Sequence, residues 1–191
     1  MNRREALQRV ALLLGGAISA PAIQAALSDW RPGPHYTPTT LTPEQFDLVA
    51  SLADLIIPAT ETPGARGVGV PEFIDLLLTE SYLPQVRDRF LAGLSAFAEQ
   101  FRQKYHKPFL QGKPEQQAEM LTELDREAVA ARLSGAADLP FFGMMKELTL
   151  IGYYTSVVGA NDELQFQPAT NRFDGCIPLE RVDGRSWAEL R

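Results

Sequence analysis

The chain has 191 residues, of which 45% are hydrophobic and 22% charged, the balance of a globular protein with a sizeable core. The formal net charge of −6 combines +2 on residues 1–28 with −8 on residues 29–191. An acidic body of this kind argues against nucleic acid or an anionic lipid surface as a partner, because both bind basic faces.

The first 28 residues have the layout of a secretory signal peptide. A basic segment, residues 2–9, precedes a short apolar run, residues 10–18, and small residues follow. Glycines, Pro21 and Gln24 interrupt the run, which is therefore shorter than the roughly 20 apolar residues of a transmembrane helix. We interpret residues 1–28 as an export signal.

Two adjacent arginines favour one type of export signal. Arg3 and Arg4, followed by Leu7, match part of the twin-arginine pattern, although Ala6 and Gln8 depart from its usual residues. The alternative is a general export signal whose basic residues happen to be adjacent. The twin-arginine route carries folded proteins, which would suit a chain that travels with a cofactor-loaded partner.

Residues 29–41 are rich in proline and predict an irregular linker. A helix is expected to follow, because Thr42 can cap it, Pro43 suits its first position and Gln45 can complete a capping box. Apolar residues then recur at helical spacing until Pro58 ends the helix.

The segment 58–71 contains three glycines in the order GxxGxG. A dinucleotide-binding loop has the order GxGxxG and follows a strand, whereas this segment follows a predicted helix. The sequence therefore favours a structured loop over a nucleotide site. Pro71 is expected to open the next helix, with its buried face formed by Phe73, Ile74, Leu77 and Leu78.

Three further helices are predicted. Residues 84–106 carry apolar side chains on one face, at Val86, Phe90, Leu94, Phe97, Phe101 and Tyr105. Residues 114–134 form an amphipathic helix that Gly135 stops, with inward side chains at Ala118, Leu121, Leu124, Ala128 or Val129, and Leu133. Residues 140–158 are apolar almost all round, which indicates a helix at the centre of the bundle or against a partner.

These elements predict a mainly α fold, a compact bundle of about five helices over residues 42–159. The tail, residues 160–191, lacks a helical period and is rich in turn residues. We expect an irregular C-terminal arm that packs on the domain or on a partner, with short extended pieces near 164–167 and 176–179.

No group of residues suggests an active site. The two histidines, His35 and His106, are not placed beside a nucleophile, and CxxC and HExxH spacings are absent. Cys176 is the single cysteine and is interpreted as a buried or interface thiol. Three carboxylates lie near the glycine loop: Asp54, Glu61 and Asp75. We interpret them as capping or loop-bracing groups rather than catalytic ones. We expect no catalytic, cofactor-binding or metal-binding residue in this chain.

Three stretches together resemble the small subunit (subunit 3, or gamma) of gluconate 2-dehydrogenase. They are EQFDLVASLADLIIPATETPGARGVGVPEFID, FFGMMKELTLIGYYTSVVGA and RFDGCIPLE, and the resemblance covers most of residues 41–180. The strings ADLIIPxTxTPGA and LTLxGYxTSxxGA are fairly specific. The chain departs from the family at Val157, where many members have Glu, and at ATNRFDGC, where many have a Pro-Gly turn.

The resemblance implies a non-catalytic subunit of an oxidoreductase complex. Its large subunit would be an FAD-dependent sugar or sugar-acid dehydrogenase of the glucose-methanol-choline type, and a c-type cytochrome would carry haem c in a third subunit. This chain lacks GxGxxG and CxxCH, so it is expected to bind neither group. The small subunit would stabilise the flavoprotein and escort it through the twin-arginine translocase to the periplasm, where the complex associates with the membrane in some arrangements.

The apolar helix and the tail need a surface to pack on, and they supply the residues expected at the partner interface: Phe141, Phe142, Tyr153, Tyr154, Phe173 and Cys176. The alternative is a stand-alone exported hydrolase or small-molecule binding protein whose site is the loop 58–71 with Asp54 and Asp75. Electron relay through Trp30, Trp187 and the tyrosines is disfavoured.

Overall fold

The computed structural model describes residues 36–136 and 138–166, together with residues 178, 180, 184, 187 and 188. The chain divides into two units, Met1–Tyr36 and Thr37–Arg191, and the account below concerns the second. The predicted export-signal residues Arg3, Arg4 and Leu7 lie outside the described residues, as do Phe173 and Cys176.

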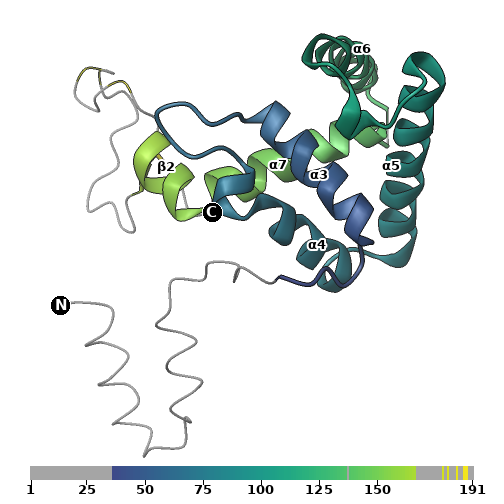
Figure 1. Cartoon of the computed structure of the whole chain (residues 1–191). Helices are drawn as coiled ribbons and strands as arrows, with labels where there is room; N and C mark the ends of the chain where they lie inside the picture. Colours follow the sequence, from purple (N-terminus) through teal and green to yellow (C-terminus); the bar gives the residue numbers. More distant parts are fainter. Residues whose placement is uncertain are drawn as a thin grey trace, which may run out of the picture. The chain divides into compact units, whose positions relative to one another are not determined.

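The second unit is a helical bundle, as predicted (Figure 1). Its five described α-helices are α3 (Pro43–Ile56), α4 (Val70–Glu80), α5 (Pro84–Tyr105), α6 (Pro114–Leu133) and α7 (Phe141–Tyr154). Short elements join or follow them: the 3-10 turns η1 (Arg66–Val68) and η2 (Phe109–Gln111), the π-helical turn η3 (Gly159–Glu163), and the strands β1 (Gln165–Phe166) and β2 (Trp187–Ala188).

The helix ends follow the signals read from the sequence. At the start of α3, the Gln45 backbone N–H donates to Thr42 Oγ1 (3.2 Å) and the Thr42 N–H donates to Gln45 Oε1 (3.0 Å), which completes the capping box. At the end of α6, Gly135 adopts a positive φ of 72°. Its N–H and that of Ala136 then donate back to carbonyls of the last turn, which confirms Gly135 as the stop.

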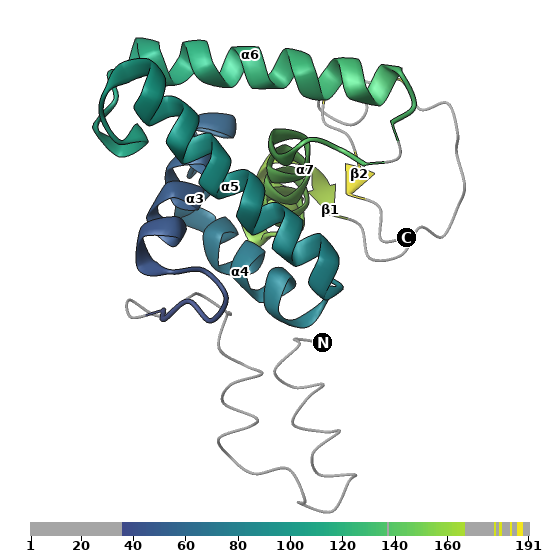
Figure 2. The same cartoon turned by 90° about the vertical axis from the view of Figure 1, so that its right-hand side faces the viewer.

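Helix α7 lies at the centre of the bundle. It contacts α3, α4, α5 and α6, and Figure 2 shows it with α6 above and α4 below. This confirms the central position that its apolar sequence allowed. The helix ends at Tyr154, four residues earlier than predicted, because the Ser156 hydroxyl donates to the Tyr153 carbonyl (2.6 Å) and accepts from the Gly159 N–H (3.1 Å).

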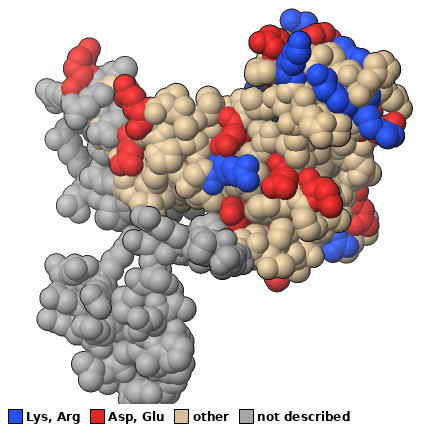
Figure 3. Space-filling model, in the orientation of Figure 1, with Lys and Arg blue, Asp and Glu red and all other residues tan. Residues whose placement is uncertain are grey.

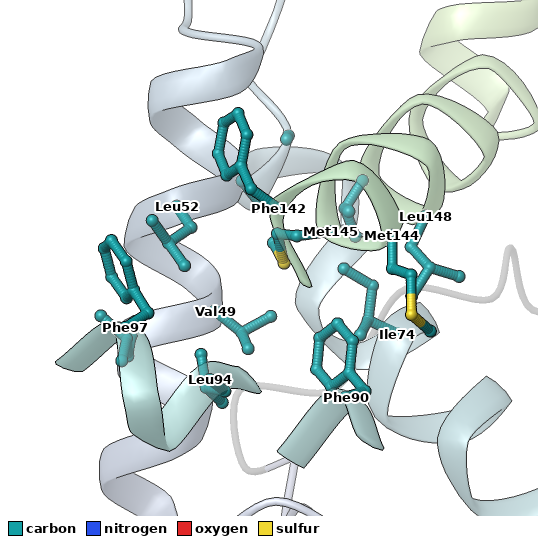
Figure 4. Close-up of a cluster of buried hydrophobic side chains, with 14 of the residues drawn as sticks. Val49, Leu52, Ile74, Phe90, Leu94, Phe97, Phe142, Met144, Met145 and Leu148 are labelled. Atoms are coloured by element: carbon teal, nitrogen blue, oxygen red, sulfur yellow. The ribbon is translucent and has the colours of Figure 1, made fainter. Parts of the chain in front are cut away.

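The core lies between α3, α4, α5 and α7. Figure 4 shows ten of its side chains: Val49, Leu52, Ile74, Phe90, Leu94, Phe97, Phe142, Met144, Met145 and Leu148. The aromatic stripe of α5 faces inward as predicted, and ring contacts extend it to neighbouring elements. Phe97 lies with its ring centroid 5.0 Å from that of Phe109 in η2 and 6.0 Å from that of Phe141 in α7.

The inward face of α6 differs from the prediction. Leu121 and Ala128 are buried and Leu124 is partly buried, as expected, and Met120 is buried with them. However, Ala118, Val129 and Leu133 are exposed, Leu133 by 84%. A helix turns by about 100° per residue, so Leu133 lies on the side opposite the ridge that reaches α7. Apolar residues occur on both sides of this helix, and only its neighbours decide which side is covered.

The described part of the C-terminal arm contains one small sheet. β1 and β2 pair in parallel, with Gln165 opposite Trp187 and Phe166 opposite Ala188. The extended piece expected near 164–167 is thereby confirmed. Most of the second expected piece, 176–179, lies outside the described residues, and the strand that pairs with β1 was not predicted.

Asp75 ties the end of the linker to the bundle. It is fully buried, and its carboxylate accepts hydrogen bonds from the backbone N–H groups of Thr39 (2.8 Å), Thr40 (3.1 Å) and Leu41 (2.8 Å). The side chain of Leu41 is 3% exposed and belongs to the core. The last linker residues therefore belong structurally to the helical body, and the bracing role inferred for Asp75 is confirmed.

We predict that Asp75→Ala destabilises the protein by about 2–4 kcal/mol, because three backbone N–H groups in or near the core lose a charged acceptor. Urea unfolding of the full chain measures this. Asp47→Ala is the control, since its ion pair with Arg66 spans 3.8 Å between exposed side chains and should be worth less than about 1 kcal/mol. Equal effects of the two substitutions would contradict the anchoring role.

Candidate functional site

The glycine-containing segment between α3 and α4 is a closed, hydrogen-bonded loop. The Ala65 N–H donates to the Ile57 carbonyl (3.0 Å), and the Arg66 N–H donates to Asp54 Oδ1 (2.9 Å). A Cβ atom on Gly64 would lie 2.7 Å from the Ala59 nitrogen, so the chain needs glycine there. The segment is a structured loop, as the order of its glycines indicated, and Asp54 braces it.

The side chain of Tyr153 joins this loop to the end of α7. Its hydroxyl donates to the Pro63 carbonyl (3.1 Å) and lies 3.2 Å from Thr62 Oγ1. Thr62 Oγ1 in turn donates to Glu163 Oε1 in η3, over 2.5 Å. Three segments far apart in sequence thus meet at one polar cluster, which we call the Tyr153 brace: Thr62, Pro63, Tyr153 and Glu163.

The Tyr153 brace explains why the two most specific sequence strings occur together. Thr62 and Pro63 belong to the string around ADLIIPATETPGA, whereas Tyr153 belongs to LTLIGYYTSVVGA. The contacts between them are structural, because the groups satisfy each other. The brace fixes the loop, the end of α7 and the turn that leads into β1 relative to one another.

The carboxylates proposed for a small-molecule site are committed to the backbone. Asp54 holds the loop, and both carboxylate oxygens of the fully buried Asp75 accept backbone hydrogen bonds. Glu61 is exposed on the loop. The alternative interpretation is a binding protein or hydrolase with its site at residues 58–71. Such a site could not use Asp54 and Asp75 as free carboxylates, because both already bind the backbone.

Glu72, in the first turn of α4, is a half-buried carboxyl beside the loop whose pKa differs from its usual value. Burial raises its pKa, while a hydrogen bond to its own backbone and the positive charge of Arg66 act weakly in the opposite direction. Among the described residues, its buried Oε2 atom has no hydrogen-bond partner. The side chain therefore holds a proton at a higher pH than an exposed glutamate does.

Most of the expected interface residues on α7 face the protein's own core. Phe142 is 5% exposed and Tyr153 2%, and the half-buried Phe141 packs on Phe90 with ring centroids 5.3 Å apart. In the chain itself, α4, α5, α3 and the loop cover the side of α7 that carries these three residues, and their place at a partner interface stays a prediction. Tyr154 is 40% exposed and remains available to a partner.

Apart from Tyr154, the exposed apolar side chains at this end of α7 were not predicted from the sequence. Leu150, Ile151 and Tyr154 are 39%, 44% and 40% exposed, and Val157, just beyond the helix, is 71% exposed. We call these four residues the α7 stripe. Residues 150, 154 and 157 are spaced by four and three, which puts them on one side of the helical path. No sequence signal marked this side, because apolar residues surround α7.

Two kinds of feature are absent from the residues that the structure describes. No three His, Cys, Asp or Glu side chains group in a way that could hold a metal ion. Within the same part of the chain, each helix is too short or too polar to span a bilayer.

We predict that Tyr153→Phe lowers the free energy of unfolding by about 1–2 kcal/mol, because the Pro63 carbonyl loses its donor within a partly buried cluster. Amide hydrogen exchange should accelerate in the loop and in η3, which the Tyr153 brace connects. Tyr154→Phe is the matched control and should leave both measurements unchanged, since Tyr154 is exposed. If the exchange rates of the loop and η3 in Tyr153→Phe equal those in Tyr154→Phe, the brace does not hold these segments.

The chain was compared with known proteins. A family model described as gluconate 2-dehydrogenase subunit 3 matches residues 43–171. The comparison with curated proteins gave no match, and neither did the comparison with solved structures. The matched range includes α3 to α7, the loop, the Tyr153 brace and the α7 stripe. The chain therefore belongs to the gluconate 2-dehydrogenase subunit 3 family.

Proposed function

We propose that this small subunit stabilises an FAD-dependent dehydrogenase of the glucose-methanol-choline type, acting on a sugar or sugar acid, and escorts it through twin-arginine export. Membership of the family makes the chain a small subunit of a dehydrogenase complex. The observation that carries the rest is the α7 stripe, an apolar surface on the helix that organises the whole bundle. Its position offers a partner direct contact with the helix that touches all four other helices of the described bundle.

The α7 stripe has the composition of a protein-binding surface. Single exposed apolar residues are common on soluble proteins, whereas neighbouring ones on one element mark contact sites. Leu150, Ile151 and Tyr154 lie within little more than one turn of α7, and Val157 continues the surface. Tyrosine is also enriched at the centre of interfaces, because it combines a large apolar ring with a hydroxyl.

The chemistry of the complex would belong to the partner. In this chain Asp54 and Asp75 serve the backbone, and the hydroxyls of Thr62 and Tyr153 serve the Tyr153 brace. FAD would be held by the large subunit, and a c-type cytochrome with haem c would accept its electrons as a third subunit. This chain would contribute stability and transport.

The export proposal rests on Arg3, Arg4 and Leu7 at the start of the chain. The linker behind them ends at the Asp75 anchor, so residues 39–41 become ordered only when the helical body has folded. A route that carries folded proteins would move this body together with a docked, FAD-loaded subunit. The complex would then act in the periplasm.

We predict that replacing Leu150, Ile151 and Tyr154 together by serine abolishes co-purification of the dehydrogenase subunit with the tagged full chain. Flavin absorbance and dehydrogenase activity in the eluate measure this. Leu110 and Leu133 are 50% and 84% exposed away from α7, so their replacement by serine is the control and should preserve the complex. Thermal unfolding checks that both variants fold. A dehydrogenase that stays bound to the α7 variant would contradict the docking role.

We also predict that Arg3→Lys with Arg4→Lys retains the dehydrogenase in the cytoplasm, because the twin-arginine route reads the guanidinium pair and the charge alone does not replace it. Dehydrogenase activity in periplasmic and cytoplasmic fractions measures the effect. Arg9→Lys is the control outside the arginine pair and should leave export unchanged. Undiminished periplasmic activity in the double variant would show that a general export signal, or none from this chain, is used.

A further inference from the structure

A small hollow lies beside the exposed side of α7, at the helix's N-terminal half. Its lining comes from four places in the chain: Tyr82 between α4 and α5, Arg89 on α5, Asp138 and Leu139 before α7, and Met144 and Glu147 on α7. Its volume is about 210 Å³. That is several times the space that one water requires, about 10–15 Å³ on the same measure, but less than the 300 Å³ or more of a typical small-molecule site. The hollow therefore has the size for a protein side chain.

Among the described residues, the charges that line the hollow leave one carboxylate outside an ion pair. Arg89 forms an ion pair with Asp138, so these two charges offset each other. Glu147 is exposed and forms no ion pair within the described part of the chain. The lining therefore has one net negative charge, which would attract a cationic group.

The remaining lining is apolar or aromatic. Met144 is 8% exposed, and Tyr82 and Leu139 are partly buried. Burial raises the pKa of Tyr82, and the negative charge of Glu147, which lines the same hollow, adds to this shift. An aromatic face beside a carboxylate suits the apolar stem and charged head of a lysine or arginine side chain.

The hollow is continuous with the α7 stripe. Glu147, Ile151 and Tyr154 are separated by four and three residues, so they follow one another along the same side of α7. A segment that covers the stripe would reach Glu147 one helical turn further on. The acidic charge of the body also favours a basic partner. Figure 3 shows Lys and Arg side chains gathered over the ends of α5 and α6, while acidic side chains are scattered over the face around α3 and α4.

We infer that the hollow receives an arginine or lysine side chain of the dehydrogenase subunit, with its stem on Tyr82 and Met144 and its charged head against Glu147. This rests on the proposed function and names the partner chemistry at that surface: apolar residues over the α7 stripe, and one basic residue beside them. The apolar contact supplies area, and the charge pair fixes the register of the docked segment.

The test compares three charge variants of the full chain: Glu147→Gln, Glu147→Lys and, as control, Glu127→Lys, which places the same new charge on the exposed side of α6. The affinity for the purified flavoprotein subunit is measured at low and high salt. We expect Glu147→Lys to weaken binding by about tenfold or more, and Glu147→Gln to weaken it less and to reduce its salt dependence. Glu127→Lys should bind as the unsubstituted chain does.

Two outcomes would overturn the inference. One is unchanged affinity of Glu147→Lys; if the serine variant of the α7 stripe still loses the dehydrogenase, the proposed function stands and only the charge pairing fails. The other is an equal loss of affinity in Glu147→Lys and Glu127→Lys, which would mean that the added charge weakens binding without contact at the hollow. If the Glu147 variants and the serine variant of the α7 stripe all still bind the dehydrogenase, both this inference and the proposed function are wrong.

Discussion

The packing of α7 is the constraint on which the rest of this fold depends. Its neighbours approach it closely at glycines: a Cβ atom on Gly152 would lie 2.7 Å from the ring of Phe73 in α4, and one on Gly93 of α5 would lie 2.5 Å from Phe141 Cβ. Such short separations let the apolar side chains of α7 interdigitate with those of α4 and α5. One side of the helix is thereby committed to the core, and the other becomes the surface that a partner can reach.

Polar groups in this bundle serve mainly to hold irregular segments against the helices. Asp75 holds the end of the linker, Asp54 holds the loop between α3 and α4, and Tyr153 joins that loop to η3. Burying a carboxylate or hydroxyl costs free energy unless it forms hydrogen bonds, so each of these groups favours the one arrangement in which its hydrogen bonds form. The result is a rigid support behind the α7 stripe, which suits a subunit whose work is to bind and to stabilise.

The proposed division of labour follows from these features. In the proposed function, a dehydrogenase subunit with FAD would fold and take up its cofactor before export by a route for folded proteins. A small subunit with a rigid apolar surface can recognise that folded state, because only a completed partner surface would match both the α7 stripe and the hollow at Glu147. The export signal and the docking surface would then lie on one chain, with docking first and export afterwards.

The sequence alone determined the start of α3, the end of α6 and the inward face of α5. Capping at Thr42, the stop at Gly135 and the spacing of the α5 aromatics are local signals that tertiary contacts did not override. The matching strings also indicated the family before the structure was known. Only the tertiary structure decided which aromatic side chains of α7 are core and which side is exposed. A helix that is apolar all round has no periodic signal, so its orientation is set by the neighbours that cover it. The same reason explains Leu133 on α6, and the hollow at Glu147 escaped prediction because its lining comes from separate segments that meet only in the folded chain.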